Sequence, residues 1–82
     1  VWAREELSRR DRSVVVIAIL TALSRVDEVG FHVHAGLNHG LSRVEIEEIM
    51  VQMTIYGGVP RAIEGTRTMQ AAFAELDGTA TP

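Results

Sequence analysis

A long apolar segment near the start of the chain, VVVIAILTAL at positions 14–23, limits what this sequence can fold into. Its first residues are β-branched, so a strand is a rival interpretation. The apolar pattern is too long for a typical strand, which favours a helix. Ser8 at the N-cap and Asp11 three residues later form a capping box and predict a helix over Arg9–Ser24. Because apolar residues surround this helix on nearly every side, we expect it to lie centrally or at a subunit interface.

Helix start and stop signals divide the rest of the chain into further helices. Ser42 and Glu45 form a second capping box, and the Gly57-Gly58 pair ends the helix that follows. Pro60 stands where a first-turn proline is tolerated. With no strand pattern and no internal repeat, we predict an all-α subunit of about four to five helices, one domain over residues 1–82. The later helices are expected from the Asp27 cap to Gly40, from Ser42 to Gly57 and from Pro60 to about Leu76.

Composition and charge exclude several classes of function. The chain has no cysteine, which excludes thiol nucleophiles, thiolate metal sites and disulfides. Its net charge is −3. The densest basic cluster is interleaved with acidic residues, so we interpret it as a solvated face and expect no nucleic-acid partner. The apolar segment is shorter than the roughly 18 residues that span a bilayer, and no secretory signal is visible. We therefore expect a cytoplasmic protein without a membrane partner. The cluster comprises Arg4, Arg9, Arg10 and Arg12.

Small size and high apolar content together favour self-association. Hydrophobic residues make up 46% of only 82 residues. A chain of this length buries a modest fraction of its surface when alone, and no disulfide supplements its core. We therefore expect a homo-oligomer.

All three histidines lie close together in the second expected helix. At helical spacing, Glu28, His32 and His39 share one face, with the small residues Ala35 and Gly36 between them. A carboxylate one turn from an imidazole, beside small residues that leave room, is typical of an acid–base site on a helix facing a cleft. The alternative interpretation is that these histidines are solvated or belong to the core of an amphipathic helix.

The histidine spacing does not favour a metal site. His32 and His34 point to roughly opposite faces of a helix, and His32 and His39 lie about 10 Å apart along its axis. Glu28 and His32 have usable spacing, but two ligands from one chain make a weak site. We therefore expect no metal. The glycines show no phosphate-binding pattern either.

Several segments of the chain resemble the carboxymuconolactone decarboxylase family. The resemblance runs from Leu7 to Glu75 and is carried by LSRRDRSVVVIAILTAL and FHVHAGLNHGLSRVEIEEIMVQMTIYGGVPRAIEGTR. It implies a small helical subunit of the alkylhydroperoxidase type that assembles as a homotrimer or homohexamer. It also implies that an N-terminal part of the subunit precedes these residues. The most specific matches are His32, the Leu37-Asn38-x-Gly40 turn, the Ser42–Glu48 helix start, Gln52 and Tyr56–Pro60.

The resemblance also implies a reaction. Decarboxylases of this family convert 4-carboxymuconolactone to 3-oxoadipate enol-lactone, in the protocatechuate branch of aromatic degradation, without metal or cofactor. Their alkylhydroperoxidase relatives carry Cys-x-x-Cys before the histidine, and here those two positions are Arg25 and Glu28. The peroxidase chemistry is therefore absent while the histidine is kept. The alternative is a family homologue with another small-molecule activity or a non-catalytic, oligomeric accessory role.

The expected reaction assigns roles to five residues. His32 matches the family's histidine and suits proton delivery to the carbanion that decarboxylation leaves, with Glu28 orienting or tuning it. An arginine is needed to hold the substrate carboxylates. Arg25 is the first choice and Arg12 the second, the alternative for each being an exposed solubilising charge. Asn38 either secures the helix end or binds substrate.

Overall fold

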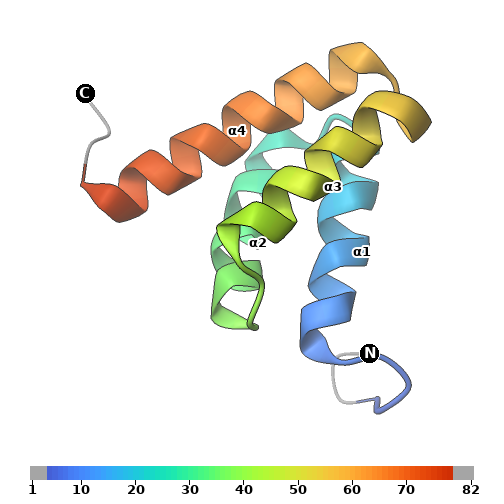
Figure 1. Cartoon of the computed structure of the whole chain (residues 1–82), viewed down its shortest axis with the longest axis vertical. Coiled ribbons are helices and arrows are strands. Elements are labelled where there is room, and N and C mark those ends of the chain that lie inside the picture. Colours follow the sequence, from blue (N-terminus) through green and yellow to red (C-terminus); the bar gives the residue numbers. More distant parts are fainter. Residues whose placement is uncertain (1–3, 79–82) are drawn as a thin grey trace.

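The computed structural model describes residues 4–78 and folds them into four helices without a strand in that range. The all-α prediction is therefore confirmed. Figure 1 shows α3 and α4 as an antiparallel pair that lies across α1 and α2. Close packing joins α1 with α2, α2 with α4 and α3 with α4. The helices are α1 (Arg9–Ala22), α2 (Val26–Asn38), α3 (Arg43–Tyr56) and α4 (Val59–Asp77).

The first helix begins as predicted and ends earlier. The Ser8 hydroxyl accepts a hydrogen bond from the Asp11 backbone amide at 3.0 Å, which caps α1. The helix was expected to reach Ser24 but ends at Ala22, because Ser24 takes a left-handed conformation with φ of 58°. One side of α1 is buried, whereas Val15 and Ile19 on the other side are exposed in this single chain.

The predicted cap of the second helix is wrong. The N-cap of α2 is Arg25, not Asp27, and no side chain caps this end. The turn after α1 brings the Arg25 amide to the Leu20 carbonyl at 2.9 Å, so the chain enters α2 before Asp27 is reached. Asp27 instead lies in the first turn, where its carboxylate still meets the positive end of the helix dipole. At the other end Gly40 has φ of 103°, as expected after a helix.

The start of the third helix confirms the clearest local signal in the sequence. The Ser42 hydroxyl accepts from the Glu45 amide at 3.1 Å, and the Glu45 carboxylate accepts from the Ser42 amide at 2.8 Å. Leu41 and Ile46, on either side of the cap, are both buried. α3 then ends before Gly57, and Gly58, with φ of 98°, turns the chain into α4.

A glycine allows a close approach between α1 and α2. A Cβ at Gly36 would lie 3.0 Å from Leu41 Cδ1 and 3.3 Å from Ile17 Cδ1, so glycine lets the helices approach tightly. The core continues from this contact into α3 and α4 and consists of aliphatic and methionine side chains apart from one phenylalanine. Its buried members are Ile17, Val29, Val33, Leu41, Ile46, Ile49, Met50, Met53, Ala62, Met69, Ala72 and Phe73.

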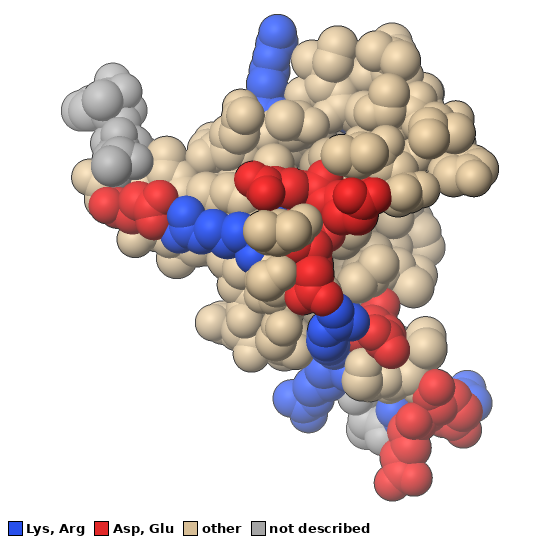
Figure 2. Space-filling view, in the orientation of Figure 1, with Lys and Arg blue, Asp and Glu red and all other residues tan. Residues whose placement is uncertain are grey.

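An arginine joins the start of α3 to the end of α4. Arg43 donates hydrogen bonds to both carboxylate oxygens of Asp77, at 2.9 and 2.6 Å, and lies 4.9 Å over the Phe73 ring. These bonds lower the pKa of Asp77 and raise the pKa of Arg43. Figure 2 shows acidic and basic side chains adjacent to one another in a band over this face. Within residues 4–78, no helix combines the length and apolar character needed to cross a bilayer.

Candidate functional site

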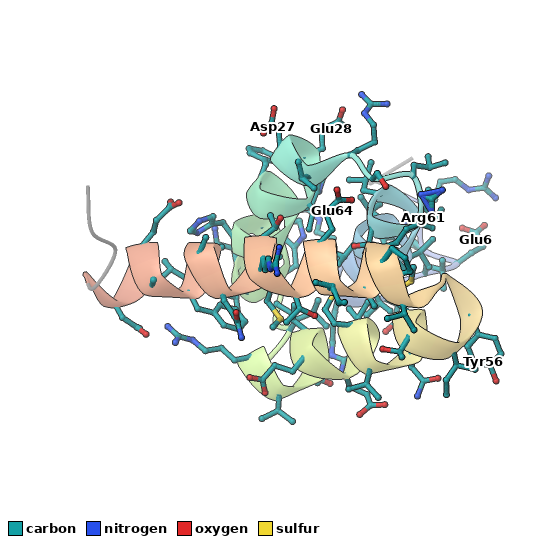
Figure 3. All side chains as sticks on the ribbon, turned by 90° about the horizontal axis from the view of Figure 1, so that it is seen from above. Glu6, Asp27, Glu28, Tyr56, Arg61 and Glu64 are labelled. Carbon is teal, nitrogen blue, oxygen red and sulfur yellow. The ribbon has the colours of Figure 1, made fainter. Side chains whose placement is uncertain are left out.

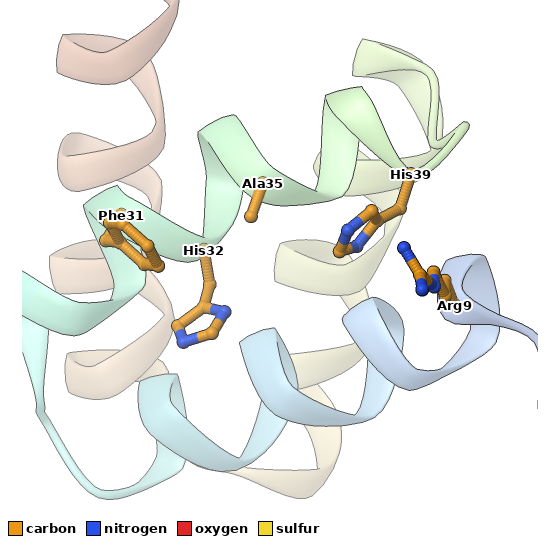
Figure 4. A pocket seen from close by; sticks show the side chains of 5 residues that line it. All are labelled: Arg9, Phe31, His32, Ala35 and His39. Atoms are coloured by element: carbon orange, nitrogen blue, oxygen red, sulfur yellow. The ribbon is translucent and has the colours of Figure 1, made fainter. Parts of the chain in front are cut away.

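A pocket of about 360 Å³ lies between the start of α1 and one face of α2. That volume is in the range of roughly 300–1,000 Å³ found for small-molecule sites. Figure 4 shows its side chains: Arg9 and His39 lie together at one end, and His32 lies toward the other, with Ala35 between. The pocket thus joins a guanidinium group with two imidazoles. Its lining residues are Arg9, Phe31, His32, Ala35 and His39.

Helical spacing explains why α2 supplies most of this wall. His32, Ala35 and His39 follow one another at three- and four-residue intervals and therefore share a face. The methyl side chain of Ala35 leaves space between the two rings. Sequence reasoning placed both histidines on this face, and the structure brings them to the same pocket.

The His39 ring is held by a residue from α1. Its Nδ1 lies 3.0 Å from the Ser13 hydroxyl oxygen. Ser13 is only 1% exposed, so its hydroxyl lies in the contact between α1 and α2. A buried hydroxyl requires a hydrogen-bond partner, and this bond therefore fixes the orientation of the ring.

The His32 ring contacts an aromatic neighbour. The Phe31 and His32 rings are edge to face, with centroids 5.1 Å apart and planes at 85°. Phe31 nevertheless remains 68% exposed. It gives the pocket an apolar edge beside the imidazole, and this contact limits the rotation of His32.

Glu28 lies with Arg25 rather than with His32. The two side chains form an ion pair across one turn of the helix, and both are exposed. Figure 3 shows Glu28 projecting outward beside Asp27 at the start of α2. Neither Arg25 nor Glu28 lines the pocket, so the structure does not bring together the predicted group of Glu28, His32 and Arg25.

Arg12 and Asn38 also lie outside the pocket lining. Arg12 is buried and donates from Nε to the Leu7 carbonyl at 3.0 Å and from Nη2 to the Arg4 carbonyl. Its guanidinium group therefore holds the segment before α1. Asn38 is exposed as the last residue of α2.

Arg9 is the pocket residue that sequence reasoning missed. It was interpreted as part of a solvated basic face, yet it lines the cavity from the first turn of α1. One signal was available: Arg9 precedes Ser13 by four residues, so both share a face of the same helix. The sequence does not show that this face meets α2 beside His39.

His34 faces away from the pocket toward α4. Its Nε2 lies 3.5 Å from a carboxylate oxygen of Glu75, on the opposite side of α2 from His32, as the helical spacing predicted. Among residues 4–78, no group of three or more histidine and carboxylate side chains is placed to hold a metal ion. Because its ring points away from the pocket, His34 offers a matched control for experiments on His32.

The pocket's groups suit one kind of chemistry. A guanidinium binds a carboxylate through two parallel hydrogen bonds, and an imidazole exchanges protons near neutral pH. Apolar surface from Phe31 and Ala35 lowers the local polarity, which strengthens both interactions. The arrangement can therefore bind a small organic acid and deliver a proton to it.

Two known proteins with similar sequences are named as decarboxylases of organic acids. The model of the carboxymuconolactone decarboxylase family matches residues 1–77. A 4-carboxymuconolactone decarboxylase of Acinetobacter baylyi is 36% identical over 76 residues, which cover 93% of this chain and 57% of that protein. A nitrosuccinic acid decarboxylase of Metarhizium robertsii is 28% identical over 76 residues, 93% of this chain and 53% of that protein. The chain thus spans just over half the length of these curated relatives, and it belongs to the carboxymuconolactone decarboxylase family.

Proposed function

We propose that this protein is a decarboxylase that converts 4-carboxymuconolactone to 3-oxoadipate enol-lactone without metal or cofactor. The observation that carries the proposal is the convergence of Arg9 and His32 in one pocket. The relative from Acinetobacter baylyi, named for this substrate, supports the choice of lactone.

The proposed reaction needs one cation and one proton donor. Arg9 binds a carboxylate and fixes the lactone in the pocket. The bond from the ring carbon to the other carboxylate breaks, carbon dioxide leaves, and the electron pair delocalises into the unsaturated lactone. His32, as imidazolium, then donates a proton to the resulting carbanion. Glu28, predicted to orient or tune His32, and Arg25, predicted to bind the substrate carboxylate, pair with each other outside the pocket and take no direct part in this step.

A direct assay tests the proposed activity. The purified chain is expected to convert 4-carboxymuconolactone with release of one carbon dioxide per lactone, followed by proton NMR and by trapped carbon dioxide. Treatment with EDTA should leave the rate unchanged, because no step uses a metal. Lack of turnover, with the pocket intact by NMR, would count against the activity and favour an accessory role in an assembly.

The second relative suggests an alternative substrate. Nitrosuccinic acid, like the lactone, has a carboxylate whose loss leaves a carbanion next to an electron-withdrawing group, here a nitro group. The same arginine and histidine would serve that reaction, with the electron pair delocalised into the nitro group. Comparing kcat/KM for nitrosuccinate and for the lactone in one preparation decides between the two substrates.

We also propose that the chain forms a homotrimer or homohexamer. Large apolar side chains gather around the junction of α3 and α4, where Tyr56 is 83% and Ile55 69% exposed, and Val59 and Ile63 are also exposed. Figure 3 shows Tyr56 projecting from this end. Burying these side chains against other copies would remove apolar surface from water. Sedimentation is expected to show a multiple of the chain mass at micromolar concentration, and a folded monomer would contradict the proposal.

A further inference from the structure

The bond between Ser13 and His39 has no part in the proton delivery assigned to His32. It joins a buried hydroxyl of α1 to the ring that closes α2, at 3.0 Å. His39 nevertheless lines the same pocket as His32. Because Nδ1 faces Ser13, Nε2 is the ring nitrogen with which His39 would meet a bound substrate.

The pocket has two chemically different ends. Arg9 and His39 lie together at one end, and His32 is toward the other (Figure 4). Seven residues of helix separate the two histidines, which places their backbones about 10 Å apart along the axis. A decarboxylase that acts on a diacid must hold the carboxylate that stays and must protonate the delocalised carbanion that remains when the other carboxylate leaves. Arg9 and His39 at one end suit the binding of the retained carboxylate, and His32 toward the other end suits proton delivery.

We propose that His39, oriented by Ser13, binds together with Arg9 the carboxylate that the substrate retains, so that the pocket selects diacids over monoacids. This inference rests on the proposed decarboxylase function and adds a specificity-determining residue to it. A retained carboxylate that accepts hydrogen bonds from Arg9 and from His39 Nε2 is held at two points, and the lactone ring that takes the proton is thereby directed toward His32.

Ser13 acts as a positioning residue in this proposal. When its hydroxyl donates to Nδ1, the neutral His39 ring carries its proton on Nε2 and remains a donor. When the ring is charged, both nitrogens carry protons and the hydroxyl accepts from Nδ1. A serine partner is therefore compatible with a protonated Nε2 in either charge state, because a hydroxyl can donate to Nδ1 or accept from it.

A selectivity measurement tests the role of His39. For the wild-type chain, kcat/KM for the diacid lactone is expected to exceed that for its half-ester, whose retained carboxylate is methylated, by about tenfold to a hundredfold. His39→Leu should lower this ratio of kcat/KM values to the selectivity that Arg9 provides without His39. His39→Gln, whose amide can place a donor near the Nε2 position, should keep more of it. The control His34→Gln should keep it all, and an unchanged ratio in His39→Leu would overturn the inference.

Binding measurements separate this inference from the proposed reaction. With histidine-labelled protein, succinate is expected to shift the ¹⁵N signals of His39, and its monomethyl ester should shift them less. Ser13→Ala should increase the share of the other ring tautomer and weaken succinate binding. If the wild type decarboxylates neither acid but succinate still perturbs His39, the reaction is wrong and the diacid site stands. If the lactone reacts but succinate does not shift the ¹⁵N signals of His39, the proposed reaction stands and this inference is wrong.

Discussion

Replacing His32 with glutamine is expected to lower kcat for the lactone by about 10²–10⁴-fold, the usual contribution of general acid–base catalysis. That loss corresponds to about 3–5 kcal/mol of activation free energy. Glutamine keeps the approximate size and one hydrogen bond of histidine but has no proton that titrates near neutral pH. The half-buried ring lies at the pocket wall rather than in the core, so the change should cost under about 1 kcal/mol of stability. Steady-state kinetics with a melting curve measures both quantities.

The matched control for this variant is His34→Gln. It makes the same chemical change two residues away on the opposite face of α2, where the ring contacts Glu75 and does not line the pocket. Its kcat should stay within about twofold of the wild type, since it touches no substrate. If His32→Gln keeps most of its activity, or if its loss of activity follows a fall in melting temperature, His32 is a packing residue and the assignment is wrong.

Replacing Arg9 with glutamine is expected to lower kcat/KM by about 10–100-fold, mainly through KM. A hydrogen bond to a charged group is worth about 1.5–3 kcal/mol, and a guanidinium makes two of them to one carboxylate. Arg9 is exposed in the first turn of α1, so its loss should change the free energy of unfolding by less than about 0.5 kcal/mol. Lysine at this position would keep the charge but not the two parallel bonds, and should recover only part of the loss.

Arg25→Gln distinguishes the structural assignment from the sequence-based one. Arg25 was the first choice for the carboxylate site, but its guanidinium pairs with Glu28 outside the pocket. Its variant should therefore reduce kcat/KM far less than the Arg9 variant does. The reverse order would show that substrate binds at the start of α2 and would place the site elsewhere than in this pocket. Arg12 is unsuitable for this comparison, because removing a buried guanidinium that binds backbone carbonyls would disturb α1 itself.

Local signals in the sequence were sufficient for most of the fold. The Ser42 capping box and the Gly57-Gly58 turn depend on residues within one turn of each other, and both form as predicted. The start of α2 was misplaced because the turn after α1 is set by a backbone bond from Arg25 to Leu20, which no side chain at Asp27 competes with. A cap residue therefore predicts where a helix begins only when no backbone hydrogen bond of the preceding turn sets an earlier start.

The candidate site was only half predictable for a similar reason. His32 and His39 share a helix face, and helical spacing alone brings them to one wall. Glu28 also shares that face by spacing, but its carboxylate pairs with the Arg25 guanidinium three residues earlier. Arg9 reaches the pocket, and Ser13 reaches the His39 ring, through the packing of α1 on α2. Ser13 is 26 residues from His39, and no sequence pattern encodes a contact at that separation.

The buried guanidinium of Arg12 gives the segment before α1 a mechanical connection to the pocket. It donates hydrogen bonds to the carbonyls of Arg4 and Leu7. Arg12 also lies within one helical turn of Arg9 and Ser13 on α1. A pull or twist on residues 4–8 is therefore transmitted to the helix end that carries the pocket's cation. For protein engineering, this makes the segment an unsuitable attachment point for tags, fusions or surface tethers. No residue of α4 lines the pocket that holds Arg9 and His32, so the end of α4 is the safer attachment point.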